Sequence, residues 1–583
     1  MLRLLRYLKA YWWQIIVLLI SVSVTVWTTL QLPNLMANII NDGIVSGDIN
    51  IIWQNGIEML VITIIGGAAT VLSGFLSARI GTGIGRTLRS DVFNKIEDFS
   101  LSEINKFSTA SLITRSTNDI QQIQIVMVML LTIGLRFPLM AVWAVIQAAG
   151  NAPNMTWIIG LAVVVLLSIV IVLIAIAMPK FTLLQKAVDK LNLVARENLT
   201  GLRVVRAFNN EKVEEEKFDR ANKDLAGLYL FVNKVMIIMM PTMQLIFSLT
   251  TLLIIWVGAH FVELGDLQIG NMMAFIQYAT QVIMSFLMIA MVFVMVPRAN
   301  VSAQRVNEVL RTKNSIVEPK RAAKFNNDGT VQFKDVTFCY PDAEEPVLQS
   351  ISFTAKPGQT TAFIGSTGSG KSTLINLVPR FFDATGGEVL IGGQNIKKLT
   401  HEQIATGIGY VPQKSVLFSG TINSNMKFGN DKATQAQIKK AINVAQASKF
   451  VDGFAEGREH EISQGGKNVS GGQKQRLSIA RAIVRDPKIY IFDDSFSALD
   501  FKTDANLRKA LKPITKKSTV LIVAQRINTI KDADQIIVLD EGKIVGRGSH
   551  RELLKKCPTY REIAQSQFSD DEIKRELAGG KNG

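Results

Sequence analysis

The pattern of hydrophobic positions divides the chain into two halves of different character. In the first half, apolar residues continue for about 20 positions or more with almost no charge, which is the length that crosses a bilayer. After Pro297 the hydropathy falls, and from Val331 onward apolar and polar residues alternate as they do in β-strands. The first half therefore predicts an α-helical membrane domain. Six runs are long enough to span a membrane: Trp12–Leu32, Met59–Ala78, Val126–Ala149, Trp157–Met178, Val235–Ala259 and Leu267–Val296.

The charges between these runs predict their orientation. The first and fifth connections carry acidic residues such as Asp48 and Glu263, and the odd-numbered connections contain no lysine or arginine. The second and fourth connections are strongly basic, and cytoplasmic loops are the ones enriched in Lys and Arg. We therefore expect a multi-pass protein of the cell membrane with both termini in the cytoplasm. The amphipathic segment Met1–Lys9 is expected to lie along the inner membrane surface, in contact with lipid.

The overall composition is consistent with this topology. The formal net charge is +16, which on a water-soluble protein would suggest nucleic acid. Here the charge mainly reflects the basic cytoplasmic loops, so we expect no nucleic-acid partner. The two cysteines, Cys339 and Cys557, both fall in the second half, which excludes a disulfide framework.

The two basic connections keep helical periodicity, so the spans are expected to continue as helices well beyond the bilayer. Each connection would then place a short helix far from the membrane. We expect these tips, near Asp98–Lys106 and Thr200–Phe208, to couple the membrane domain to the second half. A merely solvated hairpin is the alternative, which apolar Val204 and Val205 disfavour amid so much charge.

Two features of the spans leave alternatives open. Arg136 is an isolated cation inside the third span, where it predicts either a functional site or a structural partner such as a backbone carbonyl. The last two spans are rich in Met, Phe and Gln, which suit promiscuous apolar binding but also ordinary packing. These residues are Met239, Met240, Met243, Gln244, Phe247, Phe275, Gln277, Gln281, Phe286 and Met288.

One segment of the second half carries a phosphate-binding pattern. Two glycines separated by four residues precede Lys and Ser, after an apolar run and before a predicted helix. Such a loop directs its amides and the helix N-terminus at a phosphate, and we predict that it binds ATP. We expect Lys371 to reach the outer phosphates and Ser372 to hold Mg²⁺. The predicted loop is Gly365, Ser366, Thr367, Gly368, Ser369, Gly370, Lys371, Ser372 and Thr373.

Two further segments extend the nucleotide hypothesis. The apolar run Ile489–Phe492 predicts a buried strand that ends in Asp493, a second candidate ligand for Mg²⁺. Ser470, Gly471, Gly472 and Gln473 open a predicted helix and form another anion site. Because one ATP hardly needs two helix N-termini from a single chain, we expect two nucleotide domains, each supplying half of each site.

These motifs resemble an ATP-binding cassette exporter with its membrane domain fused ahead of its nucleotide domain, and the resemblance covers essentially the whole chain. The fold it implies is six transmembrane helices followed by an α/β P-loop domain. We divide the chain into a transmembrane domain with long cytoplasmic loops, 1–320, a nucleotide-binding domain, 321–566, and a charged, peripheral tail, 567–583. By this resemblance Tyr340 stacks on adenine, Ser470–Gln473 is the family's signature segment, and Asp493 is the Walker B Asp. Gln413 is the Q-loop glutamine, a ligand of Mg²⁺ that also takes part in hydrolysis, and Asp500 belongs to the D-loop.

Two departures from the family pattern are informative. Asp494 occupies the position after the Walker B Asp where the family normally has a catalytic Glu, and its side chain is one methylene shorter. Gln525 replaces the usual switch His, and an amide side chain cannot take up a proton and a positive charge at neutral pH. Lesser changes are Gln464, where exporters often have Glu, and Val469, where the signature usually has Leu.

Together these residues predict a chain that binds ATP but hydrolyses it poorly, while its signature side serves a competent partner. The combination resembles one half of the heterodimeric multidrug exporters of Gram-positive bacteria. We expect a second half-transporter with the Glu and His, and amphipathic small molecules as substrates. A lipid or peptide exporter and an ATP-gated channel on the same scaffold remain alternatives.

Overall fold

The computed structural model describes residues 2–341 and 343–578, and it forms two compact units. The first unit runs from the N-terminus to Glu97 and from Thr109 to Thr312. The second contains Asp98–Ser108 and everything from Lys313 onward. The division therefore lies near the predicted boundary at residue 320, except that a short segment of the membrane half belongs with the second unit.

Six long apolar helices of the first unit confirm the predicted spans. Two of them, α2 with 49 residues and α9 with 53 residues, are about 74 and 80 Å long at 1.5 Å per residue. Since the hydrocarbon core is about 30 Å thick, these helices continue far beyond it. The helices of this unit are η1 Leu2–Tyr11, α1 Trp12–Asn38, η2 Ile39–Ile44, α2 Ile49–Glu97, α4 Thr109–Ser116, α5 Asn118–Met129, η3 Leu130–Gly134, α6 Leu135–Asn151, η4 Pro153–Met155, α7 Thr156–Thr200, α8 Leu202–Ala207, α9 Glu211–Glu263 and α10 Ile269–Arg311.

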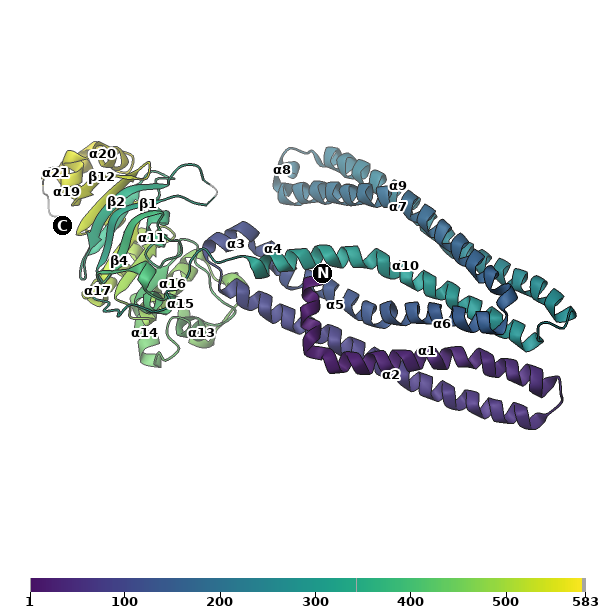
Figure 1. Cartoon of the computed structure of the whole chain (residues 1–583). Coiled ribbons are helices and arrows are strands. Elements are labelled where there is room, and N and C mark those ends of the chain that lie inside the picture. The colour runs from purple at the N-terminus through teal and green to yellow at the C-terminus, as the bar shows by residue number, and fades with distance from the viewer. Residues whose placement is uncertain (1, 342, 579–583) are drawn as a thin grey trace. The chain divides into compact units, whose positions relative to one another are not determined.

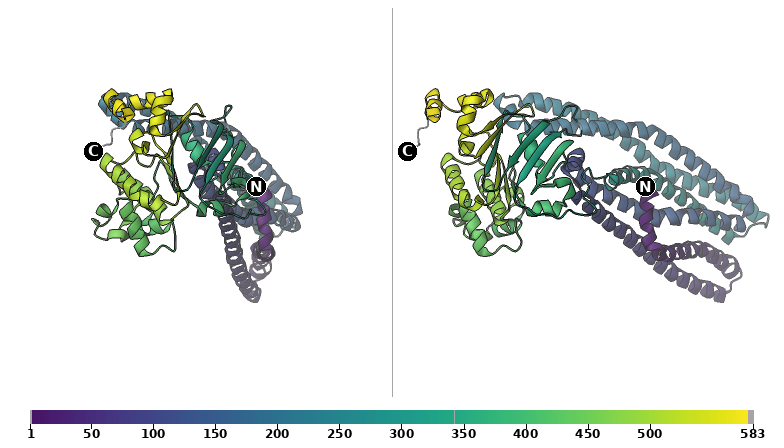
Figure 2. Two further views of the ribbon diagram at one scale, coloured as in Figure 1. Left: turned by 90° about the vertical axis from the view of Figure 1, so that its left-hand side faces the viewer. Right: turned by 60° about the vertical axis from the view of Figure 1, so that its left-hand side comes forward.

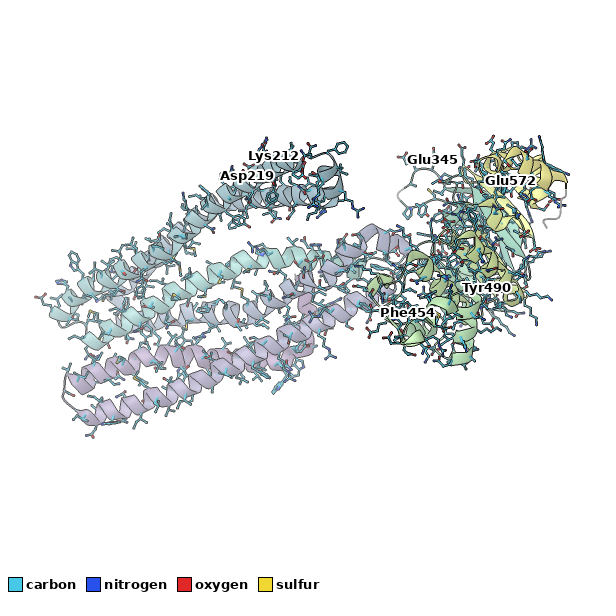
Figure 3. All side chains as sticks on the ribbon, turned by 180° about the vertical axis from the view of Figure 1, so that it is seen from behind. Lys212, Asp219, Glu345, Phe454, Tyr490 and Glu572 are labelled. Carbon is cyan, nitrogen blue, oxygen red and sulfur yellow. The ribbon has the colours of Figure 1, made fainter. Side chains whose placement is uncertain are left out.

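Within this unit the helices pack in neighbouring pairs. α1 lies beside α2, and α7 lies beside α9 with α8 at the tip of that hairpin (Figure 1). α10 packs along α5 and α6. Lys212 and Asp219 lie on α9 close to this tip (Figure 3). Apolar side chains remain exposed along the spans, Val71 and Phe75 among them, as expected of surfaces that face lipid.

The second unit is built on a six-stranded sheet whose order is β12-β11-β3-β10-β9-β6. Its strands from β11 to β6 run parallel, and β12 pairs antiparallel with β11. An antiparallel sheet of order β2-β1-β4-β5 is seen as the teal strands in Figure 2. A small β7-β8 pair completes the strands of the described residues. The strands are β1 Val331–Phe338, β2 Leu348–Ala355, β3 Thr360–Gly365, β4 Gly386–Ile391, β5 Gln394–Asn395, β6 Ile408–Val411, β7 Gly420–Thr421, β8 Glu461–Ile462, β9 Ile489–Asp493, β10 Thr519–Val523, β11 Gln535–Asp540 and β12 Lys543–Gly548.

Alternation along the parallel strands produces two apolar cores, one on each face of the sheet. On β9, Ile489 and Ile491 belong to one core, whereas Tyr490 and Phe492 belong to the other. Successive side chains of a strand point to opposite faces, so a continuous apolar run predicts a strand that is covered on both sides. Tyr490 lies well inside the unit (Figure 3). This architecture confirms the α/β fold predicted for the second half.

The helices of the second unit cover both faces of the sheet. They are α3 Leu101–Phe107, α11 Lys371–Asn376, η5 Ile396–Lys398, α12 His401–Thr406, α13 Ile422–Lys427, α14 Gln435–Val444, α15 Ser448–Val451, η6 Gly457–Glu459, η7 Gln464–Gly466, α16 Gly471–Val484, α17 Phe501–Thr515, α18 Ile527–Ile530, α19 His550–Lys556, α20 Pro558–Gln565 and α21 Asp570–Ala578.

Residues 567–578 of the C-terminal tail are not peripheral, contrary to our expectation, and 579–583 lie outside the described residues. α21 lies on the α19–α20 pair, and the buried Ile573 joins the apolar core on one face of the sheet. Glu576 forms an ion pair of 3.5 Å with Lys531. The charged composition of the tail gave no sign of this packing in the sequence. One apolar stripe is nevertheless enough to anchor a short helix on its neighbours.

Candidate functional site

Four neighbouring strands of the parallel sheet end at one edge, and the predicted site residues follow these strands. Because β10 lies between β3 and β9, and β6 lies beside β9, the segments after all four strands are adjacent. The phosphate loop follows β3, Gln525 follows β10, Asp494 follows β9 and Gln413 follows β6. Ligands of open α/β sheets bind outside the carboxyl ends of the strands, so this edge is the expected place for a nucleotide.

The phosphate loop has the strand–loop–helix geometry that its sequence predicts, between β3 and α11. Gly370 caps α11 with φ of +93°, a left-handed conformation that favours glycine. A Cβ at this position would lie 2.8 Å from Leu348 Cδ2 and 3.0 Å from the Val347 carbonyl oxygen. The second glycine of the motif is therefore required both by its backbone conformation and by the space around it.

Lys371 lies over the loop that it follows. Its ammonium donates hydrogen bonds to the carbonyl oxygens of Gly365 at 2.9 Å and Ser366 at 2.6 Å. Burial lowers the pKa of the Lys371 ammonium, and the nearby Asp494 and Asp493 act in the opposite direction. The positive charge of Lys371 thus lies at the loop, within reach of a phosphate that the loop binds.

Ser372 and Asp493 come together although they are 121 positions apart, and the Ser372 hydroxyl donates a hydrogen bond of 2.9 Å to Asp493 Oδ1. Burial raises the pKa of the Asp493 carboxyl. Both groups offer the hard oxygen ligands that Mg²⁺ prefers. Among the described residues there is no group of three or more His, Cys, Asp or Glu arranged to hold a metal. A Mg²⁺ at this pair would therefore need phosphate oxygens and water for the rest of its coordination shell, as nucleotide-bound Mg²⁺ commonly does.

Asp494 lies at the centre of a small polar cluster. Its Oδ2 accepts a hydrogen bond of 3.1 Å from Gln525 Nε2 and a longer one of 3.4 Å from Gln413 Nε2. The Asp494 backbone has a φ of +48°, which is uncommon for a residue other than glycine. Burial raises the pKa of the Asp494 carboxyl, while its bond to Gln413 lowers it. The structure thus unites the three residues predicted to take part in hydrolysis, and it ties the carboxylate to two amides.

Tyr340 lies next to the phosphate loop, and its hydroxyl is 2.9 Å from Thr373 Oγ1. Its ring is half-buried and meets the rings of Phe338 and Phe382 edge-on, at centroid distances of 4.9 and 5.4 Å. These contacts position the aromatic ring beside the phosphate-binding segment. Its stacking on adenine stays a prediction.

The signature segment forms the exposed start of α16. Ser470 caps this helix through a reciprocal pair with Gln473, in which each side chain bonds the other residue's backbone N–H. Gly471 is exposed and leaves the helix N-terminus open to an anion. On α17, Asp500 plays the same capping part by accepting a 2.9 Å hydrogen bond from the Thr503 amide, which lowers the pKa of the Asp500 carboxyl.

Two glutamines that the sequence did not single out connect these segments. Gln475, on the buried face of α16, accepts a 2.7 Å hydrogen bond from Ser415, two residues after Gln413. Gln567 bridges the backbone around Gln525: its Nε2 donates to the Gln525 carbonyl and its Oε1 accepts from the next residue but one, both at 2.8 Å. Gln475 could have been found as a polar residue on an apolar helical stripe. Gln567 carries no such signal.

One of the two predicted coupling tips belongs to the nucleotide unit. Helix α3 lies in Asp98–Ser108, and Ser315 binds it through its amide to Glu103 at 3.1 Å and through its hydroxyl to Ser100 at 2.9 Å. Leu101 packs against the apolar core that contains β1 and β2. The other tip, α8, remains in the membrane unit, where Phe208 beside it is 72% exposed.

The membrane residues singled out in the sequence separate into different environments. Arg136 lies on α6 just after the π-helical turn η3, and its Nε is buried without a hydrogen-bond partner among the described residues. Phe275 is fully buried, and Met243 packs in a cluster with residues of α7 and α10, whereas Met240 is 70% exposed. The Met, Phe and Gln residues therefore do not form one surface, and a role in substrate binding stays a prediction.

Comparison with known proteins agrees with this geometry. Residues 15–286 match the family described as ABC transporter transmembrane region, and residues 348–497 match the family described as ABC transporter. An uncharacterized ABC transporter ATP-binding protein of Mycobacterium tuberculosis (strain CDC 1551 / Oshkosh) is 40% identical over 574 residues, which cover 97% of this chain and 98% of the relative. The chain belongs to the ABC transporter family.

Other relatives of this ABC transporter span most of its length. The ATP-dependent lipid A-core flippase of Hahella chejuensis (strain KCTC 2396) is 32% identical over 523 residues, 88% of each chain. A solved structure of a bacterial Atm1-family ABC exporter with ATP bound has a TM-score of 0.79 and 24% identity, and the match covers 97% of this chain and 99% of that chain. The chain thus has the exporter-type fold, its nucleotide is ATP, and the family's activity is transport coupled to an ATPase.

Proposed function

We propose that this ABC transporter is one half of a heterodimeric exporter of amphipathic small molecules, and that its own ATP site hydrolyses slowly. The observation that carries the proposal is the cluster at Asp494. The Asp494 side chain is one methylene shorter than that of glutamate, and its carboxylate accepts hydrogen bonds from Gln525 and Gln413. A general base must first reach the water that it activates, and a misplacement of about 1 Å costs on the order of 100-fold in rate.

The raised pKa of Asp494 does not compensate for this geometry. Burial moves the pKa toward neutrality, which by itself would favour a base, but the carboxylate is already engaged by amide donors. Gln525 cannot carry a proton through the reaction, as an imidazole can. Of the described histidines in this unit, His401 is exposed at the start of α12, His460 pairs with Glu456, and His550 is buried against Tyr560. None of the three follows β10, where the switch residue is expected.

The signature segment supports a partner with complete Walker motifs. Ser470 and Gly471 keep an open helix N-terminus at the surface. This N-terminus is not needed for the ATP that the chain itself binds, because the phosphates of that ATP are held by the loop around Lys371. In the proposed dimer this segment completes the partner's site, while Ser372 and Asp493 hold Mg²⁺ at the chain's own site. The bound Mg²⁺ would neutralise phosphate charge there.

The proposal is tested by isolating the tagged full-length chain from its native membrane. A second ABC half-transporter should be recovered at a stoichiometric ratio, and ATP turnover should appear in the pair but remain very slow in this chain alone. Brisk hydrolysis by the chain alone would instead favour a homodimer that uses Asp494 as an unusual base.

The proposed orientation places the nucleotide unit and the tip of the α7–α9 hairpin in the cytoplasm. Cysteines introduced at Asp48 and Arg206 should then react with an impermeant maleimide from opposite sides of the membrane. Labelling from the same side would overturn the orientation without touching the ATP-site proposal.

Lipid export is a second candidate, favoured by the 32% identity to an ATP-dependent lipid A-core flippase. Both candidates use amphipathic cargo, so ATP turnover does not distinguish them. Proteoliposomes do: ATP-dependent movement of a fluorescent amphipathic dye without movement of labelled phospholipid supports small-molecule export. The reverse result supports lipid export.

A further inference from the structure

A basic cavity lies in the membrane unit between the N-terminal segment and α2. It has a volume of about 590 Å³. Tyr11 lines it from the end of η1 and Gln14 from the start of α1, and Arg79, Arg86 and Arg89 line it from α2. In Figure 1 the N-terminal segment η1 turns sharply away from α1 at this end of the α1–α2 pair. The cavity therefore joins segments about 70 positions apart in the sequence.

The three arginines share one face of α2 because of their spacing. Intervals of seven and three residues correspond to about two turns and one turn of an α-helix. Gly83 lies in the same stripe, and the Tyr11 hydroxyl occupies the space that a Cβ at Gly83 would need. The absence of a side chain at this position lets Tyr11 approach the backbone of α2 and close one side of the cavity.

The charge of this cavity is not neutralised by the protein. In the part of the chain that the structure describes, Arg79, Arg86 and Arg89 are exposed and their guanidinium groups form no hydrogen bond or ion pair. Among the described residues no acidic side chain lines the cavity, and the neighbouring Asp91 accepts a 2.7 Å hydrogen bond from Tyr7. The buried Oε1 of Gln14 likewise has no donor among the described residues. The cavity thus offers three cations and one unused acceptor.

The surrounding residues mark the level of the cavity in the membrane. Trp12 and Trp13 directly follow Tyr11 and are each 63% exposed, and exposed indoles favour the membrane–water interface. Earlier on α2, toward the membrane interior, Val71 and Phe75 are exposed apolar residues. A molecule in the cavity would meet arginine at the headgroup level and apolar side chains below it.

We propose that this cavity binds the headgroup of an anionic phospholipid from the inner leaflet. A phosphodiester suits guanidinium groups, which form paired hydrogen bonds with phosphate oxygens. Basic pockets between membrane helices on the cytoplasmic side are a known means of binding such headgroups. A headgroup hydroxyl can donate to Gln14 Oε1, so a glycerol headgroup fits better than choline. The inference rests on the orientation proposed above, which cysteine labelling tests separately.

Lipid affinity of the purified full-length transporter in phosphatidylcholine nanodiscs tests the proposal. Phosphatidylglycerol brominated on its acyl chains is titrated in, and quenching of the tryptophans gives its binding relative to brominated phosphatidylcholine. The wild type should prefer phosphatidylglycerol. A triple variant, R79Q/R86Q/R89Q, should lose this preference by at least about tenfold. About 1 kcal/mol per basic residue corresponds to about fivefold each, or roughly 100-fold for all three if their contributions add.

Two further variants separate the site from general basicity and from misfolding. The matched control K186Q/R196Q/K234Q removes the same charge from exposed positions outside the cavity and should keep the preference. The variant R79K/R86K/R89K keeps the charge and should retain part of the preference for phosphatidylglycerol. The proposal is overturned if the wild type shows no preference, if the glutamine triple keeps it, or if the control loses it equally. Equally effective competition by soluble glycerol phosphate would also overturn it, because the site would then recognise a free phosphate rather than a lipid.

Discussion

Replacing Asp494 by Glu together with Gln525 by His is expected to confer ATP hydrolysis on this chain's own site. In the structure Asp494 Oδ2 lies 3.1 Å from Gln525 Nε2 and 3.4 Å from Gln413 Nε2. The carboxylate is therefore bonded to the two amides and extends no further toward an attacking water. An additional methylene extends the carboxylate by roughly 1 Å toward an attacking water. The histidine removes one of the two amide donors and supplies an imidazole that can carry a proton.

The size of the effect follows from this shortfall in reach. A misplacement of about 1 Å costs on the order of 100-fold, or about 2.7 kcal/mol of transition-state stabilisation. We therefore expect D494E/Q525H to raise turnover at this site by about 100-fold. D494E alone should give less, because Gln525 continues to hold the carboxylate and cannot take up and release a proton as an imidazole can.

The assay uses the complex purified with its partner, in which the partner's catalytic carboxylate is replaced by its amide so that only this chain's site can turn over. Phosphate release is measured for the wild type, D494E and D494E/Q525H. If the wild-type site already hydrolyses as fast as D494E/Q525H, the shortened base does not limit the reaction and the reasoning is refuted. ATP binding to each variant serves as the control for folding.

Further expected outcomes concern the other parts of the site. Lys371→Ala should weaken ATP binding by about 10- to 100-fold in a nucleotide titration, because a charge-assisted hydrogen bond contributes about 1.5–3 kcal/mol. Ser470→Arg should abolish turnover by the complex, whereas Asp494→Asn should leave much of it; equal damage from both would contradict the division of roles. Gln567→Ala should speed hydrogen exchange at the Ile527 amide, which loses its 2.8 Å acceptor, and unchanged exchange would show that Gln567 does not hold this loop.

The sequence by itself determined the features that are written in consecutive residues. Six runs with almost no charge predicted the membrane helices, because an α-helix needs a continuous apolar stretch of about 20 residues to span a bilayer. The spacing of Gly365, Gly370 and Lys371 predicted the phosphate loop, since backbone wrapping of a phosphate is a local property. Asp494 and Gln525 were recognised as departures from a family pattern for the same reason, because each stands directly after a predicted strand in the sequence.

Only the tertiary structure decided which distant residues meet. The strand order brings Asp494 beside Gln413 and Gln525, yet each follows a different strand, and no local periodicity encodes that neighbourhood. Gln567, from a tail predicted to be peripheral, bonds the backbone around Gln525 for the same reason. The cavity beside Arg86 exists only because the N-terminal segment packs across α2. Local patterns specify elements, whereas the packing of apolar faces specifies which elements become neighbours, and the polar contacts at their ends follow from that packing.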